Sequence, residues 1–192
     1  SQANKTAKNN CKHVFPNLKD EEIQNIIKKS WNNLGITICE LLRINDIFIK
    51  NKIKYINLEN VEDFIKNKKQ AIFISIHQSN WEVLVPCLDR IGISIGGIYR
   101  HINNNFIDKF ILNIRQNSLV SKKSFYTPKG RKSAKDVIEG IGNAVSILLL
   151  IDQKDSSGEE VMFFNKKVKT QTGFLKIARK YNLPIIPIQN KR

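Results

Sequence analysis

One histidine and one glutamate, five positions apart, are the strongest candidates in this sequence for an acid–base pair. His77 and Glu82 lie in the segment HQSNWE, which directly follows the apolar run 71–76. An imidazole whose far ring nitrogen binds a carboxylate is held in one tautomer and becomes more basic, as a general base acting on a hydroxyl requires. On one continuous helix this spacing gives about 500° of rotation, so the two side chains would not meet. We therefore expect His77 to end a strand and Glu82 to lie in the first turn of the next helix, where the chain bend brings them together.

The same segment also has a purely structural interpretation. Ser79 followed three residues later by Glu82 is the pattern of a capping box, in which two side chains satisfy backbone N–H groups at a helix start. Glu82 would then have no chemical role, and His77 would be a hydrogen-bonded histidine at the edge of the core. The residues alone leave both interpretations open.

Two basic segments are candidate anion sites. Arg100 follows the apolar run 93–99, and a guanidinium there can clamp a phosphate or a carboxylate with two parallel hydrogen bonds. Lys129 and Arg131 flank Gly130 directly before a predicted helix N-terminus, where free N–H groups already favour an anion. Solvated surface side chains are the alternative for both segments. The second segment is not a Walker loop, because the first glycine of that motif is missing.

A third apolar run, 145–151, ends in Asp152 and Gln153. We interpret Asp152 as a polar residue at the ligand-binding edge of a sheet. The following residues do not form an EF-hand, since a lysine and a serine occupy ligand positions. His13 beside Cys11 lacks further ligands, so we expect no metal site.

Short apolar runs alternate with helical periodicity through most of the chain. We predict strands at 53–56, 71–76, 93–99, 145–151 and 184–188, and helices at 61–67, 79–90, 106–116, 133–141 and 171–181. This alternation predicts an α/β domain whose mostly parallel central sheet is flanked by helices, with 71–76 and 145–151 at its centre. Ligands of such sheets bind beyond the carboxyl ends of the strands. His77, Arg100 and Asp152 each directly follow one of these predicted strands.

The N-terminal part of the chain predicts a helical lead-in. Its first twelve residues are polar, and we expect them to be frayed. From Asp20 to Arg43 apolar residues recur at spacings of three and four, which indicates an amphipathic helix, with an interruption expected at Gly35. We expect its apolar stripe to cover the domain, with membrane binding as the alternative. The length of 192 residues suits one domain, so we predict a lead-in at 1–50 packed on an α/β core at 51–192.

The chain is strongly basic, with 32 Lys and Arg against 17 Asp and Glu and a formal charge of +15. Such a charge favours an anionic partner: nucleic acid, an anionic membrane surface, a phosphorylated substrate or an acidic protein. Lys, Asn and Ile are all over-used, so part of the charge reflects coding bias. Three scattered cysteines without a CxxC pair indicate a reducing compartment.

In this order, the segments resemble the bacterial lipid A biosynthesis acyltransferase family, the lauroyl and myristoyl transferases of lipopolysaccharide synthesis. The matching elements are His77 to Glu82 for H-x4-D/E, Gly97 to Arg100 for G-x-Y-R, Pro128 to Gly130 for P-K-G, Asp152 to Lys154 for D-Q-K, Met162 to Asn165 for a P-F-F-G-like turn, Thr170 to Gly173 for a Thr-rich helix start, and Pro184 with Pro187 for P-x-x-P. Met162 and Asn165 replace the family's Pro and Gly, and Gln78 replaces an apolar residue. The resemblance covers nearly the whole chain and implies a membrane-spanning helix before Ser1 and further residues after Arg192.

The resemblance implies a glycerolphosphate-acyltransferase-like fold and an acyltransferase activity. His77 would be the general base supported by Glu82, and the substrate-binding residues would be Arg100, Lys129, Arg131, Asp152, Gln153 and Thr172. The expected reaction transfers a fatty acyl chain from a thioester of acyl carrier protein or coenzyme A to a hydroxyl of a lipid A precursor, without a cofactor or a metal. The expected partners are acyl carrier protein, the lipid A precursor and the anionic cytoplasmic face of the inner membrane.

Two other classes of protein compete with this interpretation. A glycerol-phosphate-type or other glycolipid O-acyltransferase uses the same histidine and carboxylate chemistry. A nucleic-acid-binding module would explain the charge without chemistry. However, aromatic residues make up only 8% of the chain and do not interleave with a basic stripe, and no RNA-binding motif or zinc ligand set is present. We therefore expect no nucleic acid partner.

Overall fold

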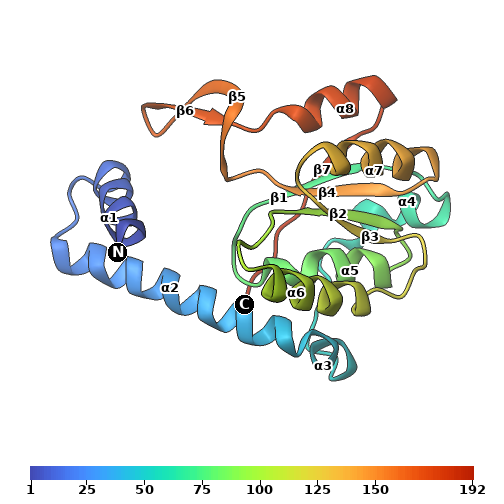
Figure 1. Cartoon of the computed structure of the whole chain (residues 1–192), viewed down its shortest axis with the longest axis horizontal. Coiled ribbons are helices and arrows are strands. Elements are labelled where there is room, and N and C mark those ends of the chain that lie inside the picture. The colour runs from blue at the N-terminus through green and yellow to red at the C-terminus, as the bar shows by residue number, and fades with distance from the viewer.

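The central feature of the structure, a computed structural model, is a five-stranded parallel sheet with strand order β3-β2-β4-β1-β7 (Figure 1). Its strands are β1 (Ile72–Ser75), β2 (Ile95–Tyr99), β3 (Phe125–Pro128), β4 (Ser146–Leu150) and β7 (Ile185–Pro187). The structure describes residues 1–192, except for the side chains of Arg131 and Ser157. The predicted α/β class with a mostly parallel sheet is confirmed, and β4 and β1 lie near its centre as expected.

Helices cover both faces of the sheet (Figure 1). One face carries η2 (Trp81–Val83), α5 (Leu84–Arg90) and α6 (Asn105–Asn117), and the other carries α7 (Arg131–Gly142) and α8 (Gly173–Tyr181). Phe73 of β1 packs in the first layer, whereas its neighbour Ile72 packs in the second. Successive strand residues point to opposite faces, so the apolar runs of β1 and β4 fill both layers at once.

The N-terminal helices extend away from the sheet and meet it through the second half of α2 (Figure 1). These helices are α1 (Gln2–Val14), α2 (Asp20–Leu42) and α3 (Ile44–Ile49), followed by η1 (Leu58–Val61) and α4 (Glu62–Lys66). Leu41 is buried and packs with Val83 and Ile111 of the domain. In contrast, Trp31, Ile38 and Leu42 remain 45%, 49% and 50% exposed, so the apolar stripe predicted for this helix is only partly covered.

Three local predictions in this region are wrong. The first residues are not frayed but form α1. At its N-terminus the backbone N–H group of Asn4 donates to the side chain of Ser1. Residues 53–56 form no strand, and Ile56 is 75% exposed, because no neighbouring strand reaches this segment. Gly35 does not interrupt α2, since a glycine only weakens a helix that tertiary contacts hold in place.

An antiparallel hairpin was not predicted. It comprises β5 (Lys154–Phe163) and β6 (Lys166–Thr170) and projects beyond the end of the sheet (Figure 1). Phe164 and Asn165 connect the strands, and both have positive φ angles, of 48° and 57°, as a tight two-residue hairpin turn requires. The turn motif identified in the sequence at 162–165 is therefore the tip of this hairpin.

The ring of Phe125 in β3 occupies a slot lined by two glycines. A Cβ atom on Gly96 of β2 would lie 2.6 Å from this ring, and one on Gly140 of α7 would lie 2.9 Å from it. Both distances are shorter than real Cβ contacts, so the edge strand β3 docks closely only because these side chains are absent. The slot thereby positions the end of β3, where Lys129 follows.

We predict that Gly96→Ala lowers the free energy of unfolding by about 1–3 kcal/mol, because the added methyl group overpacks a closely fitted ring. Chemical denaturation of the parent and the variant measures this difference. Gly35→Ala is the matched control: its Cβ would meet no atom within 4 Å, and alanine in a helix interior stabilises by about 0.5–1 kcal/mol. Equal stability of parent and Gly96→Ala would contradict the assigned packing of Phe125.

Candidate active site

The carboxyl edge of the sheet brings a histidine and an aspartate together. β1 and β4 are parallel neighbours in which Ser75 is paired with Leu150. His77 and Asp152 each lie two residues beyond that pair, so they leave the sheet side by side. The register of the two strands thus brings together side chains that are 75 positions apart in the chain.

Asp152 holds both the ring and the backbone of His77. The Nδ1–H group of His77 donates to Oδ1 of Asp152 over 2.7 Å, and the backbone N–H group of His77 donates to Oδ2 over 2.9 Å. Burial alone would raise the pKa of Asp152, but the hydrogen bonds from His77 outweigh it and the pKa is lowered. Asp152 is therefore an ionised acceptor at neutral pH, and its contribution to stability is lost only when the pH falls through this lowered pKa.

The second ring nitrogen of His77 is left as an acceptor. Because the carboxylate of Asp152 can only accept, Nδ1 carries the hydrogen and Nε2 carries the lone pair. The side-chain amide of Gln153 donates to this Nε2 over 3.2 Å. Trp81 packs edge-on against the ring, with centroids 5.1 Å apart. The neutral imidazole of His77 is thus held with Nε2 directed at the amide of Gln153, where it can accept a hydrogen bond.

Glu82 has a different partner from the one that the sequence predicts. Its two carboxylate oxygens accept from Nε and a terminal nitrogen of Arg115 in α6, over 2.8 and 2.6 Å. The side chains of Glu82 and Arg115 are only 10% and 13% exposed, so they form a buried bidentate ion pair. Among the described side chains, no hydrogen bond or ion pair joins Glu82 to His77. Asp152, rather than Glu82, is the carboxylate that binds the imidazole.

The backbone between His77 and Glu82 explains this outcome. Ser79 has a φ angle of 50°, a left-handed bend that ends the extended chain. Asn80 then caps η2, because its side chain accepts the N–H group of Glu82 over 3.1 Å. The alternative interpretation, a capping box with Ser79 as its first residue, is therefore wrong as well. The bend directs Glu82 toward α6 below the sheet instead of back toward the ring of His77.

Arg115 was not singled out from the sequence. Its guanidinium lies 5.2 Å from the ring centroid of Tyr99, in addition to binding Glu82. Burial would lower the pKa of Arg115, but the hydrogen bonds that it donates to Glu82 outweigh this effect and the pKa is raised, so the cation is permanent. The available signal was an arginine four residues after the buried Ile111, on a face of the helix that turns inward.

The remaining predicted residues lie around the same edge. Arg100 follows β2 and is exposed, with no acidic partner among the described side chains. Nζ of Lys129 lies 3.0 Å from Oδ2 of Asp155, and its backbone N–H group donates to the carbonyl of Tyr99. The side chain of Arg131 lies outside the described part of the structure. Thr172 is half-buried at the N-cap of α8 and makes no capping hydrogen bond through its side chain.

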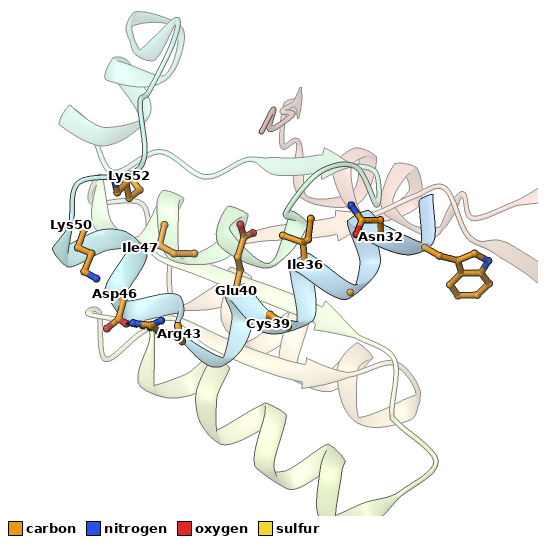
Figure 2. Close-up of a pocket in the computed structure, with 11 residues that line it drawn as sticks. Asn32, Ile36, Cys39, Glu40, Arg43, Asp46, Ile47, Lys50 and Lys52 are labelled. Atoms are coloured by element: carbon orange, nitrogen blue, oxygen red, sulfur yellow. Dashed lines mark hydrogen bonds and ion pairs between the residues drawn. The ribbon is translucent and has the colours of Figure 1, made fainter. Parts of the chain in front are cut away.

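A surface hollow of about 640 Å³ lies beside α2 (Figure 2), and Glu40 of its lining also accepts from the side-chain amide of Asn80, three residues after His77. It is lined by residues of α2 and α3 together with Lys52, and none of the predicted site residues contributes to it. Within the described residues, no cluster of His, Cys, Asp and Glu could hold a metal ion. No helix there is both long and apolar enough to cross a membrane. The histidine–aspartate pair at the sheet edge is therefore the candidate active site.

We predict that Arg115→Met lowers the free energy of unfolding by about 3–5 kcal/mol, because it leaves the carboxylate of Glu82 buried without a partner. The double variant Glu82→Gln with Arg115→Met should recover most of that loss. Denaturation curves of the single and double variants form a thermodynamic cycle that measures the coupling. Additive effects would show that the two side chains are not paired in solution.

A sequence model described as bacterial lipid A biosynthesis acyltransferase matches residues 1–192, the whole chain. A comparison with individual curated proteins gives no match. The family match covers every segment that carries the site, from His77 at the end of β1 to Thr172 before α8. The chain therefore belongs to the bacterial lipid A biosynthesis acyltransferase family, and it is an acyltransferase.

Proposed function

We propose that this acyltransferase moves a fatty acyl chain from the thioester of acyl carrier protein to a hydroxyl of a lipid A precursor, with His77 as the general base. The observation that carries the proposal is the contact between His77 and Asp152. It leaves Nε2 as a lone-pair acceptor and supplies a carboxylate to stabilise the imidazolium. Asp152 takes the orienting role that the sequence assigned to Glu82. The proposed role of Glu82 is to hold, through Arg115, the turn that carries His77.

The proposed reaction needs no covalent enzyme intermediate. The acceptor hydroxyl displaces the amide of Gln153 from Nε2 and gives its proton to His77 as its oxygen attacks the thioester carbonyl carbon. The tetrahedral intermediate then collapses, and the carbon–sulfur bond breaks. The leaving thiolate takes the proton from Nε2, so that an ester and a free thiol are released and His77 returns to its neutral form.

Cations around the edge supply anion binding in this proposal. The guanidinium of Arg100 and the ammonium of Lys129 follow neighbouring strands, because β2 pairs with β3. Both lie where a phosphate of the glycolipid or of the carrier's pantetheine arm would approach Nε2. The charge of +15 suits an acidic carrier protein and the anionic cytoplasmic face of the inner membrane, where we propose that the enzyme works. Coenzyme A is the alternative carrier.

We predict that His77→Ala lowers the rate of acyl transfer by about 10²–10⁴-fold, because the acceptor hydroxyl then lacks a base. Asp152→Asn should lower it by about 10²–10⁴-fold, because an amide neither holds the required tautomer nor stabilises the imidazolium. The measurement is acyl transfer from acyl carrier protein to a lipid A precursor. Circular dichroism of each variant confirms that it is folded.

His13→Ala is the matched control, since His13 is exposed on α1, far along the chain from the site, and its loss should leave the rate unchanged. A His77→Ala rate within a few-fold of the parent would eliminate His77 as the base. Acylation of glycerol 3-phosphate in place of the lipid A precursor would instead identify a glycerol-phosphate-type acceptor. Transfer from coenzyme A alone would identify the other donor.

A further inference from the structure

Two neighbouring helices expose a set of large apolar side chains to solvent. Ile38 and Leu42 of α2 are 49% and 50% exposed, and Phe106, Ile107 and Phe110 of α6 are 87%, 49% and 57% exposed. We call these five residues the α2–α6 face. The two helices that carry these side chains contact each other. Large exposed patches of this kind mark interaction sites in soluble domains.

The fold does not need these side chains for its own core. α6 is anchored through the buried Ile111 and Asp108, and its first turn is capped by Asn104, whose side chain accepts two backbone N–H groups. α2 is anchored through the buried Thr37 and Leu41. The α2–α6 face points away from both anchors, so the two helices are folded and positioned before anything covers it.

The position of α6 relates this face to the active site. α6 begins at Asn105, shortly after Tyr99 ends β2 at the carboxyl edge of the sheet. Phe106 is the second residue of the helix and therefore lies at its active-site end (Figure 1). The other end of α6 runs back along the sheet. The most exposed aromatic side chain of the face is thus at the end where the substrates must enter.

The charges around the face are cationic. Lys109 lies between Phe106 and Phe110 along α6, and neither Lys109 nor Arg100 has an acidic partner among the described side chains. The nearby acids are engaged: Asp108 accepts from the ring of His101 over 2.8 Å. Phenylalanine and isoleucine beside unpaired cations form the pattern of an interfacial helix on an anionic lipid surface.

We infer that the α2–α6 face inserts into the interfacial region of an anionic bilayer and thereby presents the carboxyl edge of the sheet to a membrane-held acceptor. The inference deepens the proposed function, on which it rests, because only a lipid acceptor requires the edge to face the membrane. An acidic protein would favour a surface with more cations and fewer phenylalanines. Phe106 and Phe110 enter the boundary between headgroups and acyl chains, while Lys109 remains at the phosphates.

Vesicle flotation of the 192-residue chain tests the inference, with phosphatidylcholine vesicles and with mixed phosphatidylcholine–phosphatidylglycerol vesicles. The parent should bind the anionic vesicles, and the double variant Phe106→Ser with Phe110→Ser should lower that binding about tenfold or more. Lys109→Gln should lower binding to the anionic vesicles alone, by about fivefold. The matched control is Ile56→Ser with Val120→Ser, two side chains that are 75% and 63% exposed elsewhere. That control should bind like the parent.

Vesicle binding by the double variant equal to that of the parent would overturn the inference, and so would a parent that binds neither vesicle. A dimer of the parent that sedimentation velocity detects and the double variant loses, without a change in vesicle binding, would assign the face to contact between copies and also overturn it. Acyl transfer to a detergent-dispersed acceptor separates the two proposals. Transfer without vesicle binding refutes only the membrane face, whereas vesicle binding without transfer refutes only the proposed reaction.

Discussion

The hydrogen-bonded register between β1 and β4 is the constraint on which the active site depends. The parallel pairing of Ser75 with Leu150 determines which residues lie side by side where the two strands end. His77 and Asp152 are each two residues beyond this pair, and there they form their hydrogen bond. Arg100 and Lys129 follow β2 and β3, which extend the same sheet on one side. A shift of one residue between β1 and β4 would separate the histidine from its carboxylate and also exchange the two core layers.

Much of the fold could be predicted because the strong signals are local. The runs at β1 and β4 are almost wholly apolar, as strands buried on both faces must be. The segment at 53–56 is also rich in β-branched and aromatic residues, but a strand also needs a neighbouring strand, and composition does not reveal whether one is present. The hairpin of β5 and β6 was missed because its strands are polar and packed mainly against each other.

The sequence predicts where the site residues lie along the chain, but not which of them contact each other. Sequence identified His77, Glu82 and Asp152 because all follow buried strands, and carboxyl edges are where ligands bind. The choice of Glu82 as the partner of His77 relied on proximity along the chain. The actual partner is 75 positions away and depends on strand order, which short spacings do not encode. Arg115 was not singled out for the same reason, since a helical arginine reveals its role only when its partner is known.

The ion pair between Glu82 and Arg115 has a consequence for local motion. One partner sits in the turn that carries His77, and the other sits in α6, whose far face exposes Phe106 and Phe110. Separation of α6 from the domain would leave the charged side chains of Glu82 and Arg115 without their partners in a medium of low dielectric constant. The turn that carries His77 and the helix α6 therefore open as one cooperative unit, and their backbone amides should exchange with solvent deuterium at a common rate.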